Sequence, residues 1–296
     1  MVMADIIGQE TWSADGKSYV IKVTEPGATV TENAITITGN VNLRKGDPNY
    51  SPLHPILESQ LTFTIRDTGK LFQTALEGKQ IGDIVLEFTE DGNTLFKGYV
   101  LPEYQRSLVY ETNPTYSVTA YDGINGLRGF TYDQVGTQTV RAMMYNITNK
   151  IGLSLQQNLF FDWAATGADS ATDAVDKLQI RVEHLLTDEG ATYYDVLELI
   201  CKFYVAQFFQ EDGEWYFMQR HLRGATMTNY PSNSAGGSLA DETTNFIFPV
   251  SNQTLHRADS FYDKYPASSR VVSKHTYPSY LLKNADWTEG DKYWEN

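Results

Sequence analysis

The sequence predicts a mainly β protein of the α+β class, in which an N-terminal β-barrel or sandwich-like domain precedes a small α/β domain. Three observations predict this arrangement. The first 125 residues contain a series of short segments in which apolar and polar residues alternate. Residues 126–222 change to helical spacing twice and then end in a hairpin. The chain also holds 19 Tyr and 14 Phe, residue types that favour strands.

The alternating segments of the first domain follow one another with turns between them. Apolar residues in phase predict one buried face, and a run of consecutive strands predicts a barrel or a sandwich. The Asp91-Gly92 pair predicts a tight hairpin, because Gly tolerates the positive φ that such turns require. The predicted strands cover residues 17–24, 33–41, 59–67, 82–90, 94–101 and 116–123, and a short helix covers 70–78.

The stretch DGNTLFKGYVLPEYQR, residues 91–106, carries the candidate interface residues of this domain. Gly98 inside a strand predicts a bulge or a close backbone approach, and Pro102 predicts a strand that ends at an exposed edge. An open edge needs a cover, so we expect the strand around Tyr99–Tyr104 to lie near a subunit or tube contact. Trp215, in the second hairpin EDGEWYFMQR, completes the candidate set.

The second domain, residues 126–222, is predicted as two helices with strands and a hairpin. Apolar residues at helical spacing predict a helix over 137–153, which Thr137 or Thr139 can cap. A strand is predicted over 155–163. In the second helix, Thr192 can act as the N-cap, with Asp195 in the capping-box position three residues later. The Asp212-Gly213 pair then turns a β-hairpin.

The remainder of the chain shows weaker patterns. Residues 223–245 are rich in Gly, Ser, Asn and Thr, which predicts a polar loop, a linker or a flap. The segment 246–275 is too short for a domain of its own, so we expect it to complete the first barrel. The last stretch, 276–296, begins a new aromatic-rich pattern. We interpret it as the start of a further module that is truncated here.

The charge and the motifs argue against several functions. A net charge of −14 disfavours a surface that grips nucleic acid, because phosphate binding needs clustered Lys and Arg. The N-terminus does not look like a signal peptide, and no apolar run is long enough to span a membrane. Cys201 lies in an apolar segment and is expected to be a buried, inert thiol. The histidines are not at metal-ligand spacing, and no phosphate-binding glycine loop occurs. We therefore expect no cofactor, no metal and no catalysis.

The order of these elements resembles the N-terminal part of bacteriophage tail-tip or baseplate hub proteins, particularly the long tail proteins of phages that infect Bacteroidetes-type hosts. The resemblance covers about residues 55–222. It rests on the patterns LEGKQIGDIVLEFTEDGNTLFKGYVLPE, TYSVTAYDGINGLRG and YYDVLELICKFYVAQFFQEDGEWYFMQR.

The resemblance implies a tail-tube-like first domain and a structural role in the virion. Such hubs form a ring, commonly a homotrimer, that closes the tail tube and anchors fibre or tip modules. The partners would be tail-tube or distal tail proteins, and DNA would pass through without specific binding. Two alternatives stay open from the residues. Trp and Tyr on exposed hairpins could stack on sugars in a glycan-binding adhesin, and carboxylate pairs beside the turns, such as Glu211 with Asp212, could belong to a cell-wall hydrolase.

Overall fold

The computed structural model describes the chain over residues 4–14, 16–26, 35–46, 54–101, 112–161, 175, 179–182, 190–219, 226–240 and 242–245. The chain divides into two units, Met1–Val250 and Ser251–Asn296, and every described residue belongs to the first. The segment 246–275 and the module expected at 276–296 therefore lie outside the described residues.

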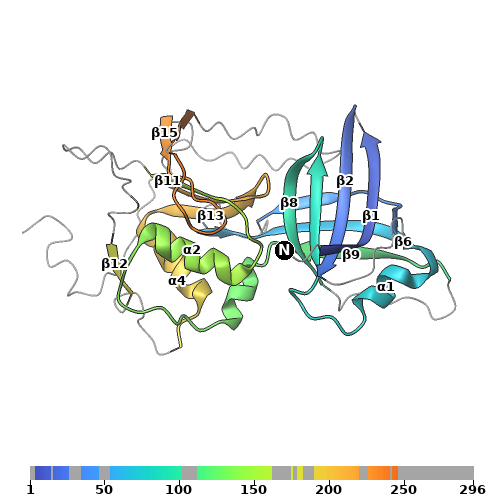
Figure 1. Cartoon of the computed structure of the whole chain (residues 1–296), viewed down its shortest axis with the longest axis horizontal. Helices are drawn as coiled ribbons and strands as arrows, with labels where there is room; N and C mark the ends of the chain where they lie inside the picture. The colour runs from blue at the N-terminus through green and yellow to red at the C-terminus, as the bar shows by residue number, and fades with distance from the viewer. Residues whose placement is uncertain are drawn as a thin grey trace, which may run out of the picture. The chain divides into compact units, whose positions relative to one another are not determined.

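An antiparallel sheet in the first half of the chain forms a nearly closed barrel (Figure 1). The strand order is β1-β2-β7-β8-β9-β6-β3, and β4 pairs with β6 beside β3. The predicted mainly β, α+β class is confirmed. The strands are β1 (Ala4–Ala14), β2 (Lys17–Pro26), β3 (Ile35–Ile37), β4 (Asn42–Lys45), β6 (Ser59–Asp67), β7 (Val85–Glu90), β8 (Asn93–Val100) and β9 (Thr115–Tyr121).

The barrel core follows from the period of two in these strands. In β6 the side chains of Leu61, Phe63 and Ile65 are buried, and the intervening residues face outward. Helix α1 (Leu71–Leu76), which follows the short 3₁₀ turn η1 (Thr68–Lys70), adds two further side chains to the same core, Phe72 and Leu76. Both the strand at 59–67 and a short helix within 70–78 are confirmed.

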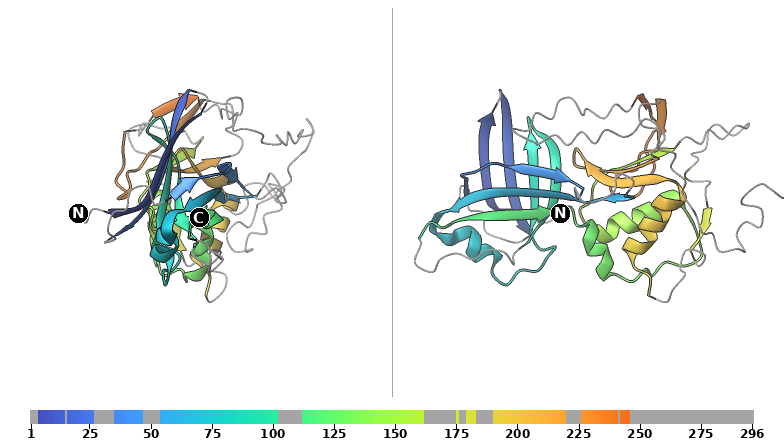
Figure 2. Two further views of the ribbon diagram at one scale, coloured as in Figure 1. Left: turned by 90° about the vertical axis from the view of Figure 1, so that its right-hand side faces the viewer. Right: turned by 180° about the vertical axis from the view of Figure 1, so that it is seen from behind.

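In a second sheet of mixed direction, one face is covered by two helices, α2 and α4 (Figures 1 and 2). The strand order is β16-β15-β11-β14-β13-β5; β11 runs parallel to β14 and β5 parallel to β13. A short 3₁₀ segment, η3 (Ile124–Gly129), and a small pair of strands flank the helices. The elements are β5 (Ile56–Leu57), β10 (Thr137–Thr139), α2 (Val140–Ile151), β11 (Gln157–Phe161), β12 (Gln179–Arg181), α4 (Tyr193–Phe203), β13 (Ala206–Glu211), β14 (Glu214–Gln219), β15 (Thr226–Asn229) and β16 (Glu242–Asn245).

The helix ends have the caps that the sequence predicts. The Thr139 side chain accepts a hydrogen bond from the Ala142 N–H at the start of α2, and Gly152 ends that helix with a positive φ. Thr192 and Asp195 form a complete capping box at the start of α4. Within the part of the chain that the structure describes, no helix has both the length and the apolar character that crossing a bilayer needs.

Two features of the fold differ from the pattern-based prediction. The segment 223–245 contains β15 and β16, whose polar residues show no apolar alternation. The chain also passes from β5 in the second sheet to β6 in the barrel with one residue, Glu58, between them. The two sheets are thus joined by almost continuous extended chain.

Candidate functional site

The candidate interface residues lie in different surroundings. Gly98 and Tyr99 belong to β8, and Trp215 belongs to β14. Tyr99 packs against the helix-side core of the second sheet, the core that contains Trp215. Pro102 and Tyr104 fall outside the described residues. Of the three described candidates, Tyr99 lies where barrel strand β8 approaches the second sheet, a place that we call the sheet junction.

Gly98 marks a close backbone approach and no bulge. A Cβ at this position would lie 2.4 Å from the Tyr121 carbonyl oxygen and 2.6 Å from the Phe96 ring. Gly98 pairs regularly with Leu86, and the register shifts instead between Phe96 and Thr94. The bulged residue of β8 is therefore Leu95, which corrects the bulge prediction. Phe96, two residues before Gly98, is buried in the barrel core.

Tyr99 lies in an interior strand, so β8 is not an open edge at this residue. The contact predicted around Tyr99 and Tyr104 stays a prediction. Tyr99 pairs with Val85 on one side and Tyr121 on the other. Its hydroxyl donates a 2.6 Å hydrogen bond to the Ile151 carbonyl at the end of α2. Burial raises the pKa of the Tyr99 phenol, so this donor stays protonated. Tyr99 thus ties the barrel to α2.

Glycine residues make room for the Tyr99 side chain. A Cβ at Gly123 would lie 3.0 Å from the Tyr99 ring, and one at Gly152 would lie 2.8 Å from its hydroxyl oxygen. Both glycines have positive φ, 84° and 86°. These two positions therefore need glycine for backbone conformation and for contact with Tyr99.

The Gln210 side chain of β13 completes the pairing of β8. The Lys97 N–H donates to Gln210 Oε1 at 2.9 Å, and Gln210 Nε2 donates to the Lys97 carbonyl at 2.8 Å. The registered pairs between β8 and β9 are limited to Tyr99 and Val100. The amide therefore acts as a one-residue strand partner where the β9 ladder ends. Sequence patterns missed this residue because Gln in a strand carries no motif.

Two further contacts fasten the second hairpin to the first part of the chain. Glu211 of β13 forms an ion pair with Lys45 of β4. Gln207 Nε2 donates to the His54 carbonyl at 3.0 Å, just before β5. The sequence offered the Glu211 carboxylate as one member of a carboxylate pair. In the structure this carboxylate is ion-paired with Lys45.

Trp215 is buried, which corrects the idea that it could stack on a sugar. Its side chain is 1% exposed and stacks on Phe208 with 5.2 Å between ring centres. A ring in this position contributes to the core between the sheet and α4. Cys201 is likewise buried, as predicted.

Asp122 is a buried carboxyl group where the barrel strands end. It accepts hydrogen bonds from the backbone N–H of Ser59, at the start of β6, and of Ile124, at the start of η3. Burial raises its pKa to about 8, although the two N–H bonds act in the opposite direction. Asp122 therefore links both chain crossings between the sheets, at 58–59 and at 122–124.

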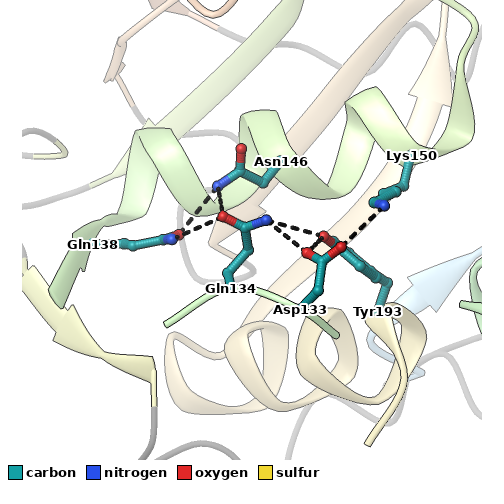
Figure 3. A network of polar contacts seen from close by, with 6 residues as sticks. All are labelled: Asp133, Gln134, Gln138, Asn146, Lys150 and Tyr193. Carbon is teal, nitrogen blue, oxygen red and sulfur yellow. Dashed lines mark hydrogen bonds and ion pairs between the residues drawn. The ribbon is translucent and has the colours of Figure 1, made fainter. Parts of the chain in front are cut away.

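A second cluster of polar side chains connects the loop after η3 with α2 and α4 (Figure 3). Asp133 Oδ1 accepts 2.6 Å hydrogen bonds from the Tyr193 hydroxyl and from Gln134 Nε2, and Lys150 Nζ lies 3.3 Å from Oδ2. The Tyr193 hydrogen bond is the main reason why the pKa of Asp133 falls to about 2. Burial, with Asp133 nearby, raises the pKa of Tyr193 to about 12.

Neither Asp133 nor Tyr193 can exchange a proton readily near neutral pH. General acid–base work needs a group whose pKa lies close to the working pH. The cluster instead presents an ionised carboxylate, a neutral phenol and several amides in fixed positions. Its chemistry is that of hydrogen bonding and positioning.

Comparisons with known proteins give partial structural matches. No family model matches the chain, and no curated protein matches its sequence. Among solved structures, the tail protein from Neisseria meningitidis MC58 is 14% identical with a TM-score of 0.41, over 67% of this chain and 50% of its own length. The 43 kDa tail protein of prophage MuSo2 from Shewanella oneidensis is 16% identical with a TM-score of 0.38, over 75% and 53%. The chain thus matches about half the length of each protein.

Proposed function

We propose that this chain is a structural, non-catalytic component of a bacteriophage tail, located in the tail tip or baseplate hub of the virion. There it would self-associate, as a homotrimer, into a ring that closes the tail tube. The observation that carries the proposal is the outer edge of β1. This strand spans Ala4–Ala14 and, among the described residues, is hydrogen-bonded along one side only, to β2.

The free side of β1 is suited to association. It approaches the other edge of the barrel sheet near Gly8, where a Cβ would lie 3.3 Å from Ile35 of the three-residue strand β3. A long unpaired edge readily pairs with another chain, and a ring gives each edge a neighbour. The subunit contact expected near Tyr99 is therefore proposed for β1 instead.

The sheet junction supports the same role. The two tail proteins above share only part of their fold with this chain, so the support comes from the chain itself. The three sequence patterns that carry the resemblance include Gly98, Asp122 and Trp215. In the structure each of these residues packs against neighbouring segments, or links them, in the region of the two sheets. A subunit that transmits load between a tube and tip modules needs its two sheets held together in this way.

The charge of the chain bears on the passage of DNA. At a net charge of −14, a ring built from this chain would carry a net negative charge, which repels phosphate groups. DNA could then pass through without specific binding. Tail-tube or distal tail proteins on one side, and fibre or tip modules on the other, are the proposed partners.

The test of this proposal measures the mass of the assembled chain by light scattering and analytical ultracentrifugation. We expect a trimer whose stability depends on the β1 edge. A Thr11→Lys, Ser13→Lys double variant places charges on exposed positions of β1 and should shift the population to monomer. The matched control is Thr115→Lys, Ser117→Lys, with the same residue types and spacing on the exposed side of β9. A monomer at all concentrations, or equal dissociation of both variants, would overturn the proposal.

A further inference from the structure

We propose that the surface around Phe130 is a binding site for a neutral oligosaccharide. This Phe130 surface consists of Phe130, Asp133, Gln134, Gln138, Asn146 and Lys150, from the loop after η3, β10 and α2. It does not depend on the ring proposed above, because the residues belong to different elements from the β1 edge.

The first argument is an exposed aromatic ring beside polar groups. Phe130 is 48% exposed, although a ring of this size normally gains stability by burial. The Lys150 ammonium lies 5.9 Å from its centre, which helps to fix the orientation of the ring. Ligand sites typically combine an apolar or aromatic surface with a few well-placed polar groups. The C–H face of a sugar ring would fit the exposed side of Phe130.

The second argument is the fixed arrangement of three amides. Gln134 Oε1 accepts from Gln138 Nε2 at 3.2 Å and from Asn146 Nδ2 at 3.3 Å, while Asn146 Nδ2 also donates to Gln138 Oε1 at 3.2 Å. Figure 3 shows the Asn146 side-chain oxygen turned away from these partners. Amides offer both donors and acceptors, as sugar hydroxyls do. Because the amides already hold one another in place, a ligand would lose less free energy in ordering them.

The third argument is charge, which selects among ligands. Asp133 stays ionised because its pKa is about 2, and Lys150 at 3.3 Å balances it. The surface therefore has charged groups without a local excess of either sign. The net charge of −14 also repels anionic polymers. A neutral glycan fits these properties better than nucleic acid or an acidic polysaccharide.

The experiment uses the full chain and four neutral probes, namely chitotetraose, cellotetraose, maltotetraose and mannotetraose. Saturation-transfer NMR detects contact with the sugar, and titration calorimetry measures its affinity. We expect at least one probe to bind, and Phe130→Ala to weaken it about tenfold, the effect of losing one good contact. The matched control is Phe203→Ala, which removes a ring of similar exposure, 47%, from α4.

A second variant tests the amides without removing the ring. Asn146→Asp keeps the shape of the side chain but removes the amide donor, so binding should weaken while the unfolding transition shows that the chain still folds. Failure of all four sugars to bind, or equal loss in Phe130→Ala and Phe203→Ala, overturns the proposal. If Phe130→Ala instead lowers the mass of the assembly and leaves sugar contact unchanged, the surface is a protein interface. The β1 double variant distinguishes this inference from the proposed function. If that variant loses the trimer and still binds the sugar, the two proposals are independent.

Discussion

The side-chain amide of Gln210 pairs with the backbone of Lys97 through both its oxygen and its nitrogen. This contact takes the place of a neighbouring strand at the point where β9 no longer pairs with β8. A side chain on the second sheet thereby supplies both backbone hydrogen-bond partners of Lys97 in barrel strand β8. The coupling between the sheets consequently depends on specific polar contacts as well as on apolar packing.

Replacing Gln210 with Leu should destabilise the chain by about 2–3 kcal/mol, because the N–H and carbonyl of Lys97 would lose their partners. Urea unfolding followed by tryptophan fluorescence measures the change. Gln179→Leu is the matched control, since Gln179 is exposed on β12. Equal shifts for the two variants would mean that the Lys97 contacts contribute little.

Gly98→Val should cost about 3 kcal/mol or more, or prevent folding, because its Cβ would overlap the Tyr121 carbonyl oxygen at 2.4 Å. A backbone atom inside a sheet cannot move aside as a flexible side chain can. Gly126→Ala provides the control, because a Cβ there meets no atom within 4 Å. Thermal unfolding compares the two, and a Gly98→Val protein as stable as the control would contradict the close approach.

The elements that the sequence predicts well are those set by local chemistry. The Thr192–Asp195 capping box and the alternation in β6 depend on residues close together in the chain, so their patterns indicate the structure directly. The burial of Trp215 and the interior position of Tyr99 depend instead on which segments meet in three dimensions. The same holds for Gln210, whose partner is 113 residues away. A sequence without a motif gives no signal for such contacts.

Because of Asp122, the stability of the folded chain should decrease as the pH rises from about 4 to about 8. The pKa of Asp122 increases from 3.8 in the unfolded chain to about 8 in the folded protein. Between these values the folded state binds the proton more tightly than the unfolded chain does. The stabilisation that comes from protonated Asp122 is therefore complete below pH 3.8, and it is lost as the pH rises through about 8. The limiting slope for one proton is about 1.4 kcal/mol per pH unit. Urea unfolding across this range should show a flatter dependence for Asp122→Asn; an unchanged slope would assign the effect elsewhere.

Replacing Arg141 should have a local effect on the segment after β15. This buried side chain of α2 donates through Nη1 to the Pro231 carbonyl at 3.0 Å and to Ser232 Oγ. Arg141→Leu would leave buried acceptors without these donors and should cost about 3 kcal/mol. Hydrogen exchange should rise in residues 230–239 before the rest of the chain unfolds.

Arg128→Leu is the control, because Arg128 is exposed and stacks on the Tyr194 ring at 3.5 Å. Its loss should cost about 1 kcal/mol or less and leave exchange at 230–239 unchanged. Equal exchange in both variants would show that Arg141 does not hold this segment.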